Sequence, residues 1–136
     1  MTENGAPGGP APKDEVVVRL PAEGAYLSVL RMVTAGLAAR LDFTVDEIED
    51  LKIAVDEACA MLLAGAMPGA ELNVAFTVGD EVLHVGVTVP TVTGEEPSRD
   101  TFSWTVLTAL AGDVDSSADA DQAVTISLHK RRGQAA

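Results

Sequence analysis

The segment of residues 44–65 reads TVDEIEDLKIAVDEACAMLLAG and has the pattern of an amphipathic helix. Thr44 and Glu47 have the T-x-x-E spacing of a capping box, in which each side chain binds the backbone N–H of the other residue. Beyond the cap, apolar residues recur every three or four positions, at Val45, Ile48, Leu51, Val55, Ala58, Cys59 and Leu62. Gly65 and Pro68 are typical of the residues that end a helix. We therefore expect a helix after Thr44 that buries one apolar stripe.

The residues before this helix predict a strand and a second helix. In EVVVRL, residues 15–20, alternate side chains are apolar, which is typical of a half-buried strand. Pro21 is expected to open a helical stretch. Its apolar stripe consists of Tyr26, Leu30, Val33, Leu37 and Leu41.

The residues after the helix predict a hairpin, a short helix and a closing strand. Two alternating runs, 72–78 and 83–89, are separated by Gly79-Asp80, which indicates a two-residue hairpin turn. A loop over 90–101 precedes a short helix over 102–111. A brief strand at 113–116 and a last strand at 123–129 complete the order β-α-α-β-β-α-(β)-β.

This order predicts the fold class. The strands alternate cleanly, so one face of the sheet is buried and the other is polar. We expect an α+β two-layer sandwich, in which a mixed or antiparallel sheet of four to five strands is covered on one face by three helices. Residues 14–132 are expected to form this single domain, and residues 1–13, rich in Gly, Pro and Ala, a disordered tail.

Charge and composition exclude several classes of function. The chain has 136 residues and a formal net charge of -12, a field that repels nucleic acid and anionic membranes but suits a basic protein partner. A single cysteine, Cys59, excludes an internal disulfide and a cysteine-based zinc site. The sequence contains no apolar run of bilayer length and no signal-peptide pattern, so a cytoplasmic protein is expected.

Individual residues give little indication of chemistry. His84 and His129 lie opposite the apolar faces of their predicted strands and are interpreted as solvated or cross-strand packing residues, with no metal role expected. Cys59 is interpreted as a small buried hydrophobe, and Trp104 and Phe102 as core anchors. The sequence shows no nucleophilic triad and no Walker-type loop.

The segment LKIAVDEACAM, residues 51–61, resembles the second long helix of the RsbW-type anti-sigma factor and serine-protein kinase family. That family shares the fold of the histidine kinase-like ATPases. Its helix has the form D-I-K-I-A-V-S-E-A-C-T-N-A, which carries a catalytic Glu and, four residues on, an Asn that binds magnesium. The resemblance places Glu57 at the Glu position. LDFTVDEIEDL (residues 41–51) and FSWTVLTALAGDV (102–114) also resemble the family, and the similarity covers about residues 15–130.

The nucleotide-binding motifs of the family are eroded in this chain. Met61 occupies the magnesium-binding Asn position, and a thioether is a poor ligand for a cation that prefers oxygen. The loop over 90–101 has only Gly94 where the family has an Asp-x-Gly-x-Gly box. PSRDTFSW replaces the phosphate-binding glycines, and Asp121-Gln122 replaces a Gly-Thr. We therefore expect weak or absent ATP binding and no cofactor, with Glu57 and Met61 marking the positions of the degenerate site.

The resemblance implies an anti-sigma factor that sequesters an alternative sigma factor of RNA polymerase. VLRMVTAGLAAR, residues 29–40, aligns Arg31 with an arginine that contacts both the sigma factor and an anti-anti-sigma protein in this family. The resemblance to this family also implies a homodimer. Two alternatives stay open. One is an active serine kinase that uses ATP and Mg²⁺ to phosphorylate an anti-anti-sigma antagonist, with Glu57 as general base. The other is an unrelated α+β interaction module.

Overall fold

The computed structural model describes residues 14–133, and the tail predicted for residues 1–13 lies outside them. The elements in chain order are β1 (Asp14–Pro21), the short 3-10 helix η1 (Gly24–Tyr26), α1 (Leu27–Arg40), α2 (Val45–Leu63), β2 (Glu71–Val78), β3 (Val82–Pro90), α3 (Phe102–Ala111), β4 (Asp113–Ala118) and β5 (Ala123–Arg131). The predicted order is confirmed, and the brief strand before β5 is a full edge strand.

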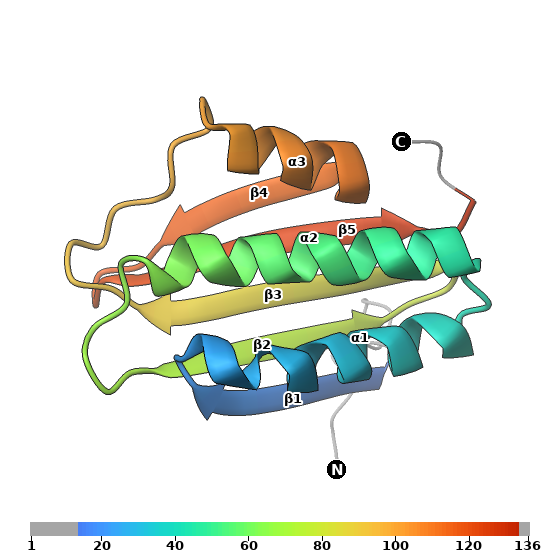
Figure 1. Ribbon diagram of the computed structural model, residues 1–136, viewed down its shortest axis with the longest axis horizontal. Helices are drawn as coiled ribbons and strands as arrows, with labels where there is room; N and C mark the ends of the chain where they lie inside the picture. The colour runs from blue at the N-terminus through green and yellow to red at the C-terminus, as the bar shows by residue number, and fades with distance from the viewer. Residues whose placement is uncertain (1–13, 134–136) are drawn as a thin grey trace, which may run out of the picture.

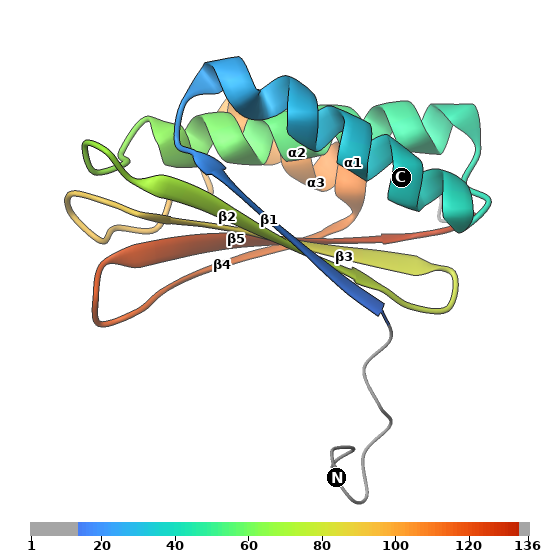
Figure 2. The ribbon, with the colours of Figure 1, turned by 90° about the horizontal axis from the view of Figure 1, so that it is seen from below.

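The five strands form one sheet in the order β1-β2-β3-β5-β4, with every neighbouring pair antiparallel. All three α-helices lie on the same face of this sheet, with α2 between α1 and α3, and no helix of residues 14–133 covers the other face (Figures 1 and 2). The predicted two-layer α+β sandwich is confirmed. Strands β1 and β4 are the two edges of the sheet.

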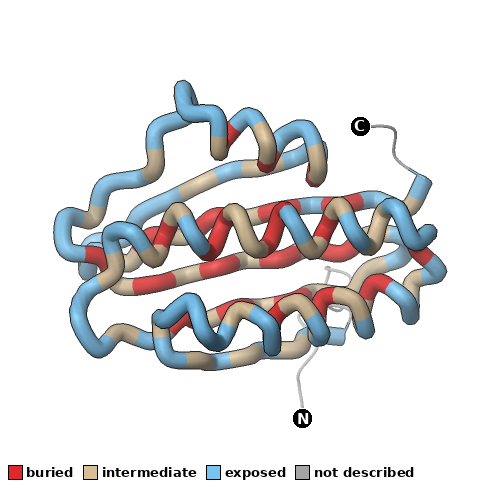
Figure 3. Tube along the Cα trace, viewed as in Figure 1, coloured by how far each residue is buried: buried red, intermediate tan, exposed pale blue. Residues whose placement is uncertain are grey.

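Helix α2 is the centre of the core, as its sequence predicted. Both hydrogen bonds of the Thr44–Glu47 capping box are present. Figure 3 shows buried residues along α2 and the central strands beneath it. Fully buried core residues include Leu51, Val55, Cys59, Val74, Phe76, Val87, Ile126 and Leu128. Val45 was wrongly placed in the stripe: it is 75% exposed, because it is the first helical residue and Phe43, just before the cap, fills the core at that end.

The start of α1 differs from the prediction, whereas most of its predicted apolar stripe is confirmed. Pro21 is the last residue of β1, paired with Glu71, and α1 begins only at Leu27. The fully buried residues of α1 are Leu30, Thr34 and Ala38, and Val33, Leu37 and Leu41 of the predicted stripe pack against the core. Tyr26 was wrongly placed in the stripe: it precedes α1 and is 40% exposed.

Two further local expectations were wrong. The β2–β3 loop has three residues, Gly79–Glu81, because Glu81 adopts a left-handed conformation (φ 62°) before Val82 resumes pairing. Phe102, expected to be a core anchor, is 82% exposed because it is the first residue of α3. Trp104, two residues further along the helix, is buried as expected. No helix within residues 14–133 is long and apolar enough to cross a membrane.

Candidate protein-binding surface

Arg31 on α1 forms an ion pair with Asp56 on α2. Its Nη1 lies 2.9 Å from Asp56 Oδ2, and the two side chains are 42% and 34% exposed. The contact joins the two helices. Sequence reasoning placed Arg31 on the surface but gave no indication of Asp56, because the pair spans 25 residues and depends on how α1 packs beside α2.

A groove of about 290 Å³ opens next to this ion pair. It is lined by Ser28, Arg31, Met32, Ala35 and Lys52. Lys52 also pairs with Glu49, at 2.9 Å, so both cations of the groove are held by acidic residues of α2. The groove thus combines two positive charges with an apolar wall.

The outward face of α1 is apolar. Met32 is 76% exposed, and Val29 and Tyr26 are each 40% exposed. From Gly24 to Leu41 the chain contains two arginines and no Asp or Glu, although the whole protein carries a net charge of -12. Large apolar side chains grouped on a surface mark interaction sites in soluble proteins. This α1 surface, defined by Tyr26, Val29, Arg31 and Met32, is the candidate protein-binding surface.

Met61 borders only a small cavity. The cavity measures about 70 Å³, and the residues that line it are Met61, Leu62, Gly65, Thr91, Thr93, Glu95 and Pro97. Sites for small molecules commonly measure about 300–1,000 Å³. Glu57 is partly buried on the same helix but is not one of the lining residues. The structure therefore does not bring Glu57 and Met61 together around a space of nucleotide size.

The loop after β3 forms one wall of the cavity beside Met61. Val92 N donates to Gly65 O at 3.0 Å, which ties the loop to the end of α2. Thr91 Oγ1 donates to Gln122 O and accepts from Gly94 N. Gly94 has φ 73°, and a Cβ there would lie 3.1 Å from the Gln122 side chain. The lone glycine of this loop thus serves a tight turn against the β4–β5 connection.

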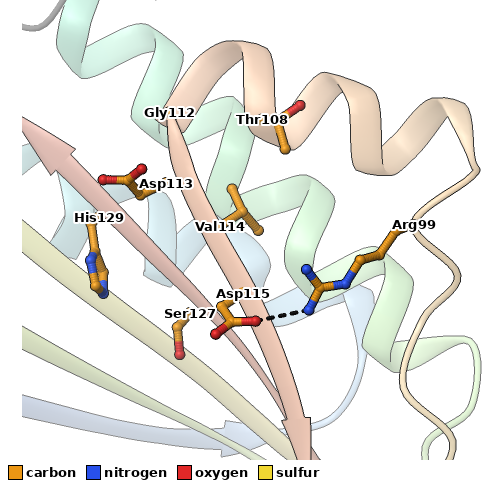
Figure 4. Close-up of a pocket in the computed structure, with 8 residues that line it drawn as sticks. All are labelled: Arg99, Thr108, Gly112, Asp113, Val114, Asp115, Ser127 and His129. Atoms are coloured by element: carbon orange, nitrogen blue, oxygen red, sulfur yellow. Dashed lines mark hydrogen bonds and ion pairs between the residues drawn. The ribbon is translucent and has the colours of Figure 1, made fainter.

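The segment in place of the family's phosphate-binding glycines is held by Arg99. Arg99 Nη2 lies 2.8 Å from Asp115 Oδ1 on β4, and its guanidinium stacks 4.8 Å from the centre of the Trp104 ring. The hydrogen bond from Arg99 lowers the pKa of the Asp115 carboxyl, helped by Ser116 N. Arg99 and Asp115 border a concavity of about 480 Å³ at the β4 edge that is also lined by His129 (Figure 4). The one arginine that lines the concavity is thus already paired with Asp115.

The remaining candidate residues follow their simplest interpretation. His84 and His129 pair across β3 and β5 with ring centres 4.2 Å apart, which confirms cross-strand packing. Burial lowers the pKa of His84, and the nearby His129 and Arg131 lower it further. Cys59 is fully buried, and that burial raises the pKa of its thiol to about 12. Residues 14–133 contain no group of three His, Cys, Asp or Glu side chains placed to hold a metal ion.

Comparison with known proteins connects this fold and surface to one group. No family model matches the chain. It is 37% identical over 75 residues to the serine-protein kinase RsbW of Bacillus subtilis, a match that covers 53% of the chain and 47% of that protein. It is 33% identical over 96 residues to the anti-sigma-F factor RsbW of Mycobacterium tuberculosis strain H37Rv, over 71% of the chain and 57% of that protein. The chain thus spans about half the length of these relatives.

A solved structure has the same fold. The chain superposes on a crystal structure of RsbU and RsbW domains from Mycobacterium tuberculosis with a TM-score of 0.69 and 18% identity, over 93% of the chain and 34% of that chain. The architecture is therefore that of an RsbW domain, with its histidine kinase-like ATPase fold. Together with the sequence matches, this confirms the resemblance seen in residues 51–61: the chain is a homologue of the RsbW-type anti-sigma factors and serine-protein kinases.

Proposed function

We propose that this protein is an anti-sigma factor that binds an alternative sigma factor and keeps it from RNA polymerase. The observation that carries the proposal is the α1 surface, where Met32 is 76% exposed beside the Arg31 guanidinium on an otherwise acidic molecule. The relatives that carry the name anti-sigma-F factor support the same function.

Charge complementarity supports a basic partner with a local acidic contact. Sigma factors carry basic patches that face DNA and polymerase, and an acidic binder speeds association with such surfaces. The α1 surface itself has no acidic residue between Gly24 and Leu41, so it suits an apolar segment of the partner with a carboxylate opposite Arg31. Long-range attraction and local fit would thus come from different parts of the molecule.

The proposal includes weak or absent ATP binding. A cavity of about 70 Å³ beside Met61 is far below the size of common small-molecule sites, and the loop at 91–97 lies across it. Met61 offers no oxygen for Mg²⁺. Sequestration by this protein would then depend on partner concentrations and not on nucleotide.

The retained Glu57 supports a second candidate, a serine kinase that phosphorylates an anti-anti-sigma protein. In that case Glu57 would take the proton of the substrate serine while Mg²⁺-ATP occupied an opened form of the site. Transfer of labelled phosphate to an anti-anti-sigma protein, lost in Glu57→Gln, would establish it. Binding to such an antagonist, homodimer formation and a cytoplasmic location accompany either candidate as part of the proposal.

The test is direct binding to the alternative sigma factors of the organism that encodes this chain, measured by calorimetry and by transcription with purified polymerase. We expect one sigma factor to bind and to lose its transcription activity when the protein is in excess. Met32→Glu should weaken this binding by about tenfold or more, since a buried apolar contact would be replaced by a charge. Phe102→Glu, at the 82% exposed residue of α3, is the matched control.

Two results would contradict the proposal. If no sigma factor binds at about 10 μM, a weak affinity for a sequestering protein, the function is different. If Met32→Glu and Phe102→Glu weaken binding equally, the partner does not dock on the α1 surface.

A further inference from the structure

Asp56 holds the one arginine of the α1 surface from the neighbouring helix. Its two carboxylate oxygens have different surroundings. Oδ2 meets Arg31 Nη1 at 2.9 Å, whereas Oδ1 is buried and has no hydrogen-bond partner among the described residues. The carboxylate is therefore set with one oxygen turned inward and the other turned toward α1.

This contact uses little of the guanidinium. Arg31 has five N–H donors in a planar fork, and within residues 14–133 only Asp56 accepts from it, through a single nitrogen. The side chain is still 42% exposed and borders the 290 Å³ groove with Met32 and Lys52. Donors thus remain for a second carboxylate next to an apolar wall.

Resting on the proposed partner-binding function, we propose that Asp56 is a positioning residue that fixes the Arg31 guanidinium for an acidic side chain of the partner. The partner segment presents a carboxylate to the free donors of Arg31 and an adjacent apolar side chain to Met32 and the groove. An arginine side chain loses rotamer freedom when it is immobilised at an interface. Because Asp56 already restrains Arg31 in the free protein, part of this loss occurs before the partner arrives.

The experiment measures partner affinity for Asp56→Ala, Asp56→Asn, Arg31→Ala and the Asp56→Ala/Arg31→Ala double variant. Immobilising one long side chain costs an amount equivalent to about a two- to tenfold change in Kd, so Asp56→Ala should weaken binding by about that factor. Asp56→Asn keeps an oxygen for Arg31 and should weaken binding less. In the Arg31→Ala background the Asp56 change should have no further effect, as expected for a residue that acts through Arg31.

Two controls separate positioning from a general effect of charge. Arg40→Ala removes the other arginine of α1, and Asp46→Ala removes an exposed acidic residue of α2 outside the groove. Both should bind like the parent protein. The melting temperatures of all variants should differ from that of the parent protein by no more than the small effect expected from the loss of an exposed ion pair. Changes in affinity then reflect binding and not misfolding.

A measurement without any partner separates this proposal from the proposed function. The Arg31 Nε–Hε group should give an NMR order parameter near the rigid range in the free protein and below about 0.6 in Asp56→Ala. A flexible Arg31 in the parent protein overturns the positioning role, whether or not a sigma factor binds. Equal or tighter binding by Asp56→Ala also overturns it, because Asp56 would then be inert or would compete with the partner's carboxylate. If Arg31 is rigid but the protein binds no sigma factor, the proposed anti-sigma function is wrong. The proposed contact between Arg31 and an acidic side chain of the partner is then wrong as well.

Discussion

Glu47 and Gly133, 86 positions apart in the sequence, share a hydrogen bond: Gly133 N donates to Glu47 Oε2 at 2.6 Å. The other oxygen, Oε1, accepts from Thr44 N at 2.8 Å and closes the capping box. Arg132, the preceding residue, donates to Leu41 O at 3.2 Å. The chain after β5 is therefore fastened to the turn between α1 and α2, at the end of the molecule where α2 begins.

Removal of the Glu47 side chain should destabilise the protein. Glu47→Ala leaves two backbone N–H groups without their partner, and the loss of a cap costs about 1–2 kcal/mol of the free energy of unfolding. Urea unfolding measures this change. Glu49→Ala, at an exposed residue two positions further along α2, should change the free energy of unfolding by less than about 0.5 kcal/mol. Equal effects of the two substitutions would show that the cap contributes nothing specific.

The same carboxyl should make stability depend on pH in the acid range. The backbone N–H of Thr44, and then that of Gly133, lower the pKa of Glu47 below its ordinary value of 4.5. A carboxyl whose folded pKa is lowered stabilises the fold above its unfolded pKa, and this contribution is lost as pH falls through the folded pKa. The parent protein should thus lose more stability than Glu47→Gln between pH 5 and pH 3, in urea unfolding at fixed ionic strength. Parallel curves for the two proteins would contradict this assignment.

Core truncations on α2 should rank by the volume that they remove. Leu51 and Val55 are fully buried, so Leu51→Ala should cost about 2–4 kcal/mol of unfolding free energy and Val55→Ala somewhat less. Val45→Ala is the control on the same helix, because Val45 is 75% exposed, and it should be nearly neutral. A large effect of Val45→Ala would mean that the start of α2 packs differently.

Mg²⁺-ATP should not bind with micromolar affinity in calorimetry. We expect this because the loop after β3 is tied to Gly65 O and the cavity beside Met61 measures only about 70 Å³, below the common size of small-molecule sites. For the same reason Met61→Asn, which restores an oxygen ligand, should not restore binding. Micromolar Mg²⁺-dependent affinity in the parent protein would overturn this prediction and would make Glu57 a general base again.

Stability should also fall as pH drops below about 6.5, the ordinary pKa of histidine. Burial, with His129 and Arg131 close by, lowers the pKa of His84, so the unfolded chain binds a proton that the folded chain does not. Folding is therefore favoured above the unfolded pKa and is progressively weakened below it. His84→Gln should flatten the curve of unfolding free energy between pH 7.5 and pH 5.5. If the unfolding free energy of His84→Gln depends on pH as steeply as that of the parent protein, His84 is not the cause of the pH dependence.

The sequence predicted most of the fold because its strongest patterns agree with one another. The Thr44–Glu47 cap and the stripe through Leu51 and Val55 specify α2, and the alternating strands require a single covered face. Errors arose at the starts of helices, where the apolar pattern continues past the residues that packing covers. Tyr26, Val45 and Phe102 were all expected to be buried and are all exposed.

The sequence indicated only one of the two residues that form the ion pair at the candidate protein-binding surface. Arg31 could be named from its place in the resemblance, but Asp56 could not, because no local pattern reports which residues meet across two helices. A similar limit applies to Arg99, whose contacts with Asp115 and Trp104 depend on where the loop before α3 lies. Ion pairs between distant segments follow from the packing of elements, which the spacing of residues does not encode.

The edge strand β4 bears on how these molecules behave when crowded. A sheet edge exposes unpaired backbone groups and is a template for a strand from another molecule, which is the first step of aggregation. Strand β4 has six residues and carries Asp113 and Asp115, with Asp119 and Asp121 just beyond it. A second β4 that approached it would bring like charges together at close range. At this edge the acidic sequence therefore opposes growth of the sheet into a fibril.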